Sequence, residues 1–320
     1  MKVHRQERYE YARLEDGHIR LLEIKSKSQV SLGGFLEARL ISISLEKAKE
    51  RGYEALSYTW QEEKPSHPIL VDGNRIDITS NLRDLLLARR RSLSQVNRVV
   101  WVDAICINQA DVQGEKPAQI LMMKDIYRNA SRVIGWLGDD WNSSLAAEMI
   151  IDVDATLKIF DWNEMQFYDN WRWTKDGPRW QALVQAVCHS YFSRAWICQE
   201  IVLGHQFQFY LGGHYISWHT FSNVIMHLTQ PGLSSLLQQN ATPASPKVNY
   251  FMDNVVMISC IRGFGNSMQY PLGVLLFMFA RLGAGEPQDK IYALLGLSNT
   301  RLSQKITPNY TKADQDMVFN

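Results

Sequence analysis

The chain has 320 residues, of which 46% are hydrophobic and 21% are charged, and its formal net charge is +1. These values are typical of a globular protein with one large domain or two, and a near-neutral charge does not indicate a nucleic-acid partner. The longest apolar run, residues 270–280, is too short to span a membrane. The N-terminus lacks the apolar core of a signal peptide, and the four scattered cysteines indicate reduced thiols, so we expect a cytoplasmic protein.

The first half of the chain predicts strands alternating with helices. Alternating or continuous apolar residues predict strands at 19–22, 38–43, 53–58, 99–102 and 132–137, and a hairpin over 69–78 that turns at Asp-Gly-Asn. Helical periodicity predicts one helix over 81–91 and another that begins at Pro117, after a polar loop at 108–115. This order favours an α/β layered fold with right-handed crossovers.

The second half is less regular. We expect an insertion at about 140–180, a helix over 179–189, and a helix capped by Ser193. A hairpin around two glycines, a loop rich in Gln, Ser and Pro, and a short helix stopped by glycine are predicted at 207–218, 230–246 and 289–295. The chain ends at Asn320 without an evident closing element, as a fragment of a longer protein would.

The helix that follows Ser193 carries an isolated acid among apolar residues. Trp196 and Glu200 are four residues apart and therefore share one helix face. A carboxylate in such surroundings is either buried at a cost or held at the edge of a pocket. This choice decides whether Glu200 has a catalytic or a structural role.

Several segments resemble the signatures of the fungal heterokaryon-incompatibility (HET) domain. The first two read Tyr-Glu-Ala-Leu-Ser-Tyr-Thr-Trp at 53–60 and Trp-Val-Asp-Ala-Ile-Cys-Ile-Asn-Gln at 101–109. Further similar segments lie at 123–138, 194–200 and 289–297. The resemblance runs from about Tyr53 to Leu203, with the last segment downstream, and several long motifs in the right order make it specific.

Two positions depart from the family pattern. Gln61 stands where the family usually has glycine after the signature tryptophan. In the loop after Gln109, the spacing from Asp to Glu is one residue longer, and Glu115-Lys116 replaces the common Glu-Arg. Both departures concern the geometry of a loop near the expected pocket.

The HET domain is itself similar to the Toll/interleukin-1 receptor (TIR) domain, and this resemblance implies the fold. We expect a TIR-like (flavodoxin-like) α/β fold with a central, mostly parallel sheet flanked by helices, added hairpins and a helical C-terminal region. The expected parts are an N-terminal strand extension at 1–50, a HET (TIR-like) domain at 51–205 and a family-associated region at 206–320.

The resemblance also implies a function. TIR enzymes that destroy NAD carry Trp-x-x-x-Glu on the corresponding helix, and the glutamate is catalytic; Trp196 and Glu200 have this spacing. The first hypothesis is therefore a fungal heterokaryon-incompatibility and cell-death effector that cleaves NAD+ as its substrate, with Glu200 as the catalytic carboxylate. The alternative is a non-enzymatic self-association and signalling module, and the third hypothesis is a remnant scaffold. The implied partners are a second copy of the chain or an incompatibility partner protein.

NAD chemistry is compatible with one carboxylate. Most glycosidases use two, because the leaving alkoxide must be protonated. Nicotinamide instead leaves a pyridinium as a neutral ring, so no general acid is required. Strand ends of an open parallel sheet are where such a ligand binds. The candidate substrate-binding residues are Ser57, Tyr58, Trp60, Asp103, Asn108, Arg194 and Trp196.

Each candidate also has a structural interpretation. Glu200 is an acid on the helix surface or a partner of Arg194 or Arg132. Trp196 is a core residue, Tyr58 and Trp60 pack at a strand end, Asp103 caps a loop or helix, and Asn108 forms a turn. The histidines are dispersed and no HExxH, GxGxxG or P-loop pattern occurs, so we expect no metal site and no bound cofactor.

Overall fold

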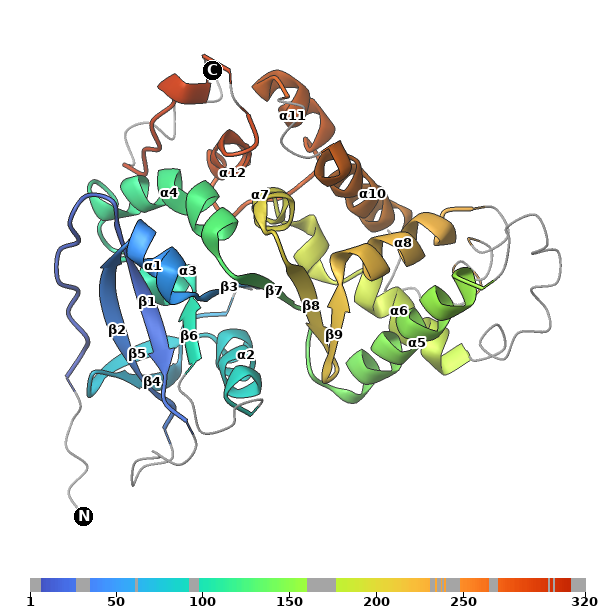
Figure 1. Cartoon of the computed structure of the whole chain (residues 1–320), viewed down its shortest axis with the longest axis horizontal. Helices are drawn as coiled ribbons and strands as arrows, with labels where there is room; N and C mark the ends of the chain where they lie inside the picture. Colours follow the sequence, from blue (N-terminus) through green and yellow to red (C-terminus); the bar gives the residue numbers. More distant parts are fainter. Residues whose placement is uncertain are drawn as a thin grey trace.

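In the residues that it describes, a computed structural model of the chain shows a nine-stranded sheet with helices packed around it (Figure 1). The structure describes residues 7–26, 35–60, 63–91, 98–159, 177–230, 234, 237, 239, 248–264, 270–298, 300, 301 and 303–311. The strands are β1 (His18–Ile24), β2 (Glu37–Ser44), β3 (Glu54–Ser57), β4 (His67–Val71), β5 (Asn74–Ile78), β6 (Arg98–Trp101), β7 (Arg132–Trp136), β8 (Phe207–Leu211) and β9 (His214–Ser217). Their order across the sheet is β5-β4-β2-β1-β6-β3-β7-β8-β9.

The centre of the sheet is parallel and its flanks are largely antiparallel. β6, β3, β7 and β8 are adjacent and parallel. β1 pairs with β6 and β2 in antiparallel fashion, and the β4–β5 and β8–β9 hairpins add antiparallel pairs, although β2 and β4 are parallel. The expectation of a mostly parallel sheet is thus replaced by a mixed sheet, because the N-terminal strands and the hairpins extend both sides of the parallel centre.

Two groups of helices can be distinguished in Figure 1. α4, α7 and α12 lie next to one another, and α5, α6, α8 and α10 pack together near β8 and β9. The bounds are α1 (Leu45–Arg51), α2 (Ser80–Arg91), α3 (Asp103–Cys106), α4 (Glu115–Asn129), α5 (Trp141–Leu157), α6 (Gly177–Val187), η4 (Ser190–Ser193), α7 (Ile197–Leu203), α8 (Trp218–Leu228), α10 (Val248–Phe264), α11 (Leu272–Met278), α12 (Asp289–Leu295) and η6 (Ser303–Lys305). In the part of the chain that the structure describes, no helix is long and apolar enough to cross a membrane.

Local sequence explains most of these elements. The predicted strands and both predicted hairpins are confirmed, and the first hairpin turns through positive φ at Asp72 (50°) and Gly73 (84°). α4 begins at Glu115, two residues before Pro117, because the Asp111 carboxylate accepts hydrogen bonds from the amides of Gly114 and Glu115. Residues 160–176 and most of the predicted 230–246 loop lie outside the described residues.

The helix that carries Glu200 begins later than predicted. Ser193 ends the 3-10 helix η4 and does not cap α7. Arg194 is extended (φ −83°, ψ 134°) and forms a parallel bridge with Gly283, so the chain becomes helical only after Trp196. This short extended segment sets the direction of α7.

Candidate functional site

The candidate residues come from three elements that meet at one edge of the sheet. β3 ends at Ser57, and α3 begins at Asp103, just after β6. α7 precedes β8, which is parallel to β7, so the helix begins at the carboxyl edge and returns the chain to the amino edge. Its Glu200 therefore reaches Ser57 at the end of β3.

Glu200 is enclosed by polar partners. Glu200 is 1% exposed, and its carboxylate accepts a short hydrogen bond from Ser57 Oγ. Arg194 Nη2 lies 3.2 Å from Oε1, and Arg194 Nη1 lies 3.5 Å from Oε2. Because the single Ser57 proton goes to Glu200, the Tyr191 hydroxyl donates to Ser57 Oγ, 2.5 Å away. Burial raises the pKa of Tyr191 and the nearby Glu200 charge raises it further, so the phenol keeps the proton that it donates.

Asp103 is the second acid of this edge, and it is only partly buried. Its Oδ2 accepts from Trp60 Nε1 at 3.0 Å, and its Oδ1 accepts from the Ala104 amide at 2.7 Å. The N-cap of α3 is Val102, so Asp103 is the first residue of this helix and does not cap it. Burial raises the pKa of Asp103 to about 6, opposed by the positive charge of Arg194 and reinforced by Glu200. Asp103 is therefore an acid that titrates close to neutral pH.

A cavity of about 440 Å³, which we call the carboxyl-edge cavity, opens beside these residues. Four of the candidates line it: Trp60, Asp103, Arg194 and Trp196. Ser57, Tyr58, Asn108 and Glu200 do not line it, and Glu200 lies behind Arg194. The complete lining is Thr59, Trp60, Asp103, Ile107, Gln109, Lys116, Ile120, Met123, Arg194, Trp196, Gly283, Ala284, Gly285, Glu286, Asp289 and Tyr310.

The structure distinguishes between the ligand-binding and the structural interpretation of each aromatic candidate. Tyr58 is 2% exposed and packs in the core, as its structural interpretation expects. Trp60 is 41% exposed and contributes its indole to the cavity wall. Trp196 is partly buried against the core and also faces the cavity. Tyr58 therefore supports the site from behind, whereas the two indoles are available to a ligand.

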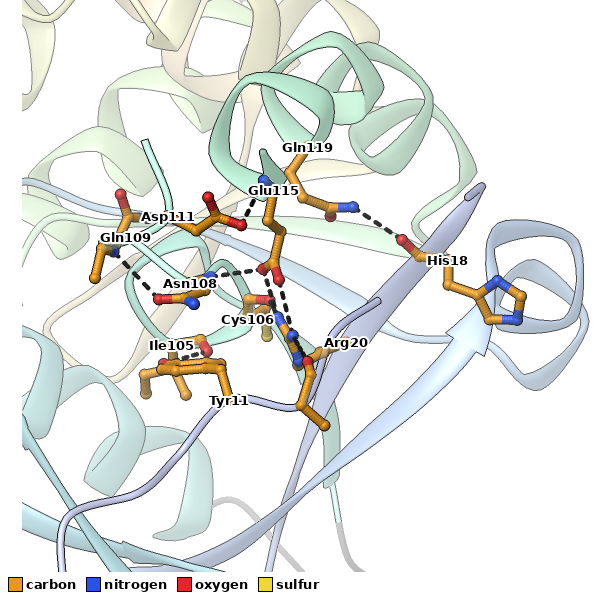
Figure 2. Close-up of polar contacts among 12 residues, drawn as sticks. Tyr11, His18, Arg20, Ile105, Cys106, Asn108, Gln109, Asp111, Glu115 and Gln119 are labelled. Carbon is orange, nitrogen blue, oxygen red and sulfur yellow. Dashed lines mark hydrogen bonds and ion pairs between the residues drawn. The ribbon is translucent and has the colours of Figure 1, made fainter. Parts of the chain in front are cut away.

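The loop with Asn108 is held in place by a buried ion pair from the N-terminal strand (Figure 2). Arg20 is 3% exposed and bonds to both carboxylate oxygens of Glu115, at 2.5 and 2.9 Å. The same carboxylate accepts from the Asn108 amide at 2.7 Å. Asn108 thus anchors the loop. Its neighbour Gln109 lines the cavity and donates to the Asp103 carbonyl at 2.9 Å.

Comparison with known proteins shows which family resembles the segment that builds most of this edge. Residues 53–200 match the sequence model of the family described as heterokaryon incompatibility protein (HET). We call this matching segment, which is less than half of the chain, the HET domain. The chain is also 27% identical over 308 residues to heterokaryon incompatibility protein 6, OR allele, of Neurospora crassa. That alignment covers 81% of this chain and 45% of the relative, so the chain spans less than half of the relative's length. No solved structure matches, and the TIR-like relationship stays a prediction.

The HET domain supplies only part of the cavity. Gly283, Ala284, Gly285, Glu286, Asp289 and Tyr310 come from beyond residue 200. The sequence did not predict these residues as part of a site, and it placed Lys116 only in a loop near the expected pocket. One signal was present: Asp289 opens the downstream segment at 289–297 that resembles the family. Tyr310 carries no local signal, because its contacts depend on the tertiary fold.

The charged and aromatic groups define what the cavity can hold. Arg194 and Lys116 provide cations, Asp103, Glu286 and Asp289 provide acids, and the rings of Trp60, Trp196 and Tyr310 provide flat apolar surface. Among the residues that the structure describes, no three His, Cys, Asp or Glu side chains gather as metal ligands would. This combination suits a ligand with planar rings and phosphate groups.

Proposed function

We propose that the chain is an effector domain of fungal heterokaryon incompatibility and programmed cell death, and that it acts by cleaving NAD+. The HET domain at 53–200 and the similarity to the Neurospora protein support the biological role. The parallel strands run β6-β3-β7-β8, which in chain order is second, first, third, fourth, as in flavodoxin-like sheets. This order and the spacing of Trp196 and Glu200 support a TIR-like enzyme.

The volume and the lining of the carboxyl-edge cavity support a nucleotide ligand such as NAD+. Its volume of about 440 Å³ falls within the range of small-molecule sites, roughly 300–1,000 Å³. Trp60 and Trp196 offer stacking surfaces to the bases, and Arg194 and Lys116 bind the pyrophosphate. The Asp103 carboxylate attracts the positively charged nicotinamide ring.

The observation that carries the proposal is the position of Arg194 between the cavity and Glu200. Its side chain lines the cavity and also lies 3.2 Å from Glu200 Oε1. A bound pyrophosphate competes for the same guanidinium, because phosphates and carboxylates use the same N–H donors. When Arg194 turns to the phosphate, Glu200 faces the reacting ribose.

The reaction then needs one carboxylate. The bond between the ribose carbon and the nicotinamide nitrogen breaks, and its electron pair stays on nitrogen, so nicotinamide leaves as a neutral molecule. Glu200 stabilises the positive charge that develops on the ribosyl carbon. Water or a nucleophile within the ribosyl product then forms the new bond at that carbon and releases a proton.

Nicotinamide release from NAD+ by the purified protein tests this proposal. Glu200→Gln keeps the shape of the side chain and removes its charge, so release falls by about a hundred- to thousand-fold. Glu46→Gln on α1 is the matched control, because Glu46 is exposed and remote from the cavity lining, and its rate stays that of the unmodified protein. Equal rates for the Glu200 variant and the unmodified protein would refute catalysis by this carboxylate.

The second candidate function is a non-enzymatic module that signals by self-association. The enclosure of Glu200 by Ser57 and Arg194 favours it, because this arrangement needs no ligand to satisfy the carboxylate. In that case the protein releases no nicotinamide, even at concentrations where light scattering shows oligomers. Release that increases with oligomerisation excludes this candidate.

A further inference from the structure

Asp289 joins two aromatic walls of the carboxyl-edge cavity. It lies at the start of α12, beyond the HET domain, and lines the cavity. Its Oδ2 accepts a hydrogen bond from Trp196 Nε1 at 3.2 Å, and its Oδ1 accepts one from the Tyr310 hydroxyl at 2.5 Å. One carboxylate therefore fixes the polar ends of two rings that are 114 residues apart in the sequence (310 minus 196).

Backbone contacts fix the position of Asp289 itself. The preceding segment pairs with the chain just before α7: the Ala195 amide donates to the Gly283 carbonyl at 2.8 Å, and the Gly283 amide donates to the Ser193 carbonyl at 2.7 Å. At the end of α12, Gly296 lies so close to Gln199 that an added Cβ would be 2.0 Å from Gln199 Nε2. α12 is thus docked directly against α7.

The segment with Tyr310 is fixed in the same way. The Asn309 amide donates to the Tyr292 hydroxyl of α12 at 3.0 Å. On the cavity side, Lys116 Nζ lies 4.2 Å from the centre of the Tyr310 ring, a cation–π contact with a residue of the HET domain. The Tyr310 ring is consequently held between Asp289 and Lys116.

We infer that Asp289 is a positioning residue that orients Trp196 and Tyr310 so that a planar heteroaromatic ring of the ligand stacks on them. An indole or phenol that lacks its acceptor regains rotational freedom, and a ligand that must order it again binds more weakly. The acceptor is a carboxylate, whose hydrogen bonds are stronger than those of neutral groups. The identity of the ligand, NAD+, rests on the proposed function; the orientation of the rings does not.

Two variants and two measurements test this inference. Asp289→Ala removes both acceptors, and Asp289→Asn keeps one oxygen acceptor. In a 15N-labelled protein, the indole signal of Trp196 is identified among the ten tryptophans by its loss in Trp196→Phe. We expect this signal to move in Asp289→Ala and to move less in Asp289→Asn. We also expect Asp289→Ala to weaken NAD+ binding about ten- to hundred-fold, with Asp289→Asn intermediate.

The kinetic pattern separates positioning from general loss of structure. Asp289→Ala raises KM for NAD+ and changes kcat by less than about threefold, because the rings contribute to binding before and during the reaction alike. Lys290→Ala is the control, since Lys290 is the exposed neighbour on α12, and it leaves the indole signal and KM unchanged. Thermal unfolding of every variant confirms that the protein compared is folded.

Several outcomes overturn the inference. An unchanged Trp196 indole signal in Asp289→Ala shows that the carboxylate does not orient the ring, whatever happens to NAD+. A shifted signal with unchanged NAD+ binding shows that the orientation is irrelevant to the ligand. If the unmodified protein does not bind NAD+, the proposed function fails, and the indole signal alone decides whether Asp289 orients Trp196.

Discussion

The two ends of β3 each meet a buried glutamate, and the two glutamates are satisfied very differently. At the amino edge, Glu54 is 7% exposed and bonds with guanidinium groups from α2, β6 and β7: Arg89 at 2.6 Å, Arg98 at 2.9 Å, and Arg132 through a short contact. At the carboxyl edge, Glu200 bonds with one arginine of the described residues, Arg194, at 3.2 and 3.5 Å, and with the Ser57 hydroxyl.

This difference indicates that one end of β3 serves stability, whereas the other end lies at the edge with the cavity that we propose binds a ligand. Glu54 joins a helix and two strands through bonds to three cations, so rearranging it would take this acceptor from all three, including Arg89, whose side chain is 0% exposed. Glu200 depends on a longer ion pair with an arginine that also faces a cavity. Among the described residues, Glu200 bonds with a single cation, which a ligand can attract away, and such a carboxylate is suited to chemistry. It lies at the edge where open α/β sheets bind ligands.

The largest expected effect is at the amino edge. Glu54→Ala removes the common acceptor of three arginines, including Arg89, whose side chain is 0% exposed. Breaking a buried ion pair by removing one partner costs about 3–5 kcal/mol. Urea unfolding should therefore show a loss of free energy of unfolding in this range. A loss below about 1 kcal/mol would mean that Glu54 does not hold the amino edge together.

The carboxyl edge should lose less stability. In Glu200→Gln the amide oxygen still accepts the Ser57 proton, and the Arg194 side chain, 17% exposed, can hydrate through the cavity. We expect the free energy of unfolding to fall by about 1–2 kcal/mol, the size of one weakened hydrogen bond to a charged group. A loss as large as that of Glu54→Ala would erase the distinction between the two edges and assign Glu200 a structural role.

The sequence predicts the strands of this comparison but not their charged partners. The apolar runs of β3, β6 and β7 and the hairpin turn at Asp72 and Gly73 are local signals, and they are confirmed. Arg194 and Arg132 were equal candidates as the partner of Glu200. The structure pairs Arg194 with Glu200 and Arg132 with Glu54. This choice depends on strand register, which no local pattern specifies.

The sequence also predicts only some of the residues that line the cavity. Trp60, Asp103, Arg194 and Trp196 lie in recognisable motifs, and the tendency of ligands to bind at strand ends brings them together. The wall formed by Asp289 and Tyr310 depends on contacts with residues far away in the sequence, such as Trp196. The antiparallel entry of β1 beside β6 is likewise a non-local pairing.

The smallest expected effect is a pH dependence confined to the carboxyl edge. Burial raises the pKa of Asp103 to about 6, above its value in an unfolded chain, so the folded state retains this proton between about pH 4 and pH 6. The contribution of Asp103 to stability therefore falls as pH rises through this window. The proposed binding of NAD+ should change in the opposite direction, because only ionised Asp103 would attract the positively charged nicotinamide ring.

We expect NAD+ affinity to increase by up to about tenfold between pH 5 and pH 7, which is the change in the ionised fraction of a group with a pKa of about 6. Calorimetry across this range measures the increase. Asp103→Asn stays neutral at every pH, so its affinity should be low and flat. NADH, whose nicotinamide ring is uncharged, serves as the matched ligand control and should show little pH dependence. If the affinity of Asp103→Asn for NAD+ still increased with pH, the titrating group would not be Asp103. The carboxyl edge would then lack the pH-dependent charge that distinguishes it from the amino edge.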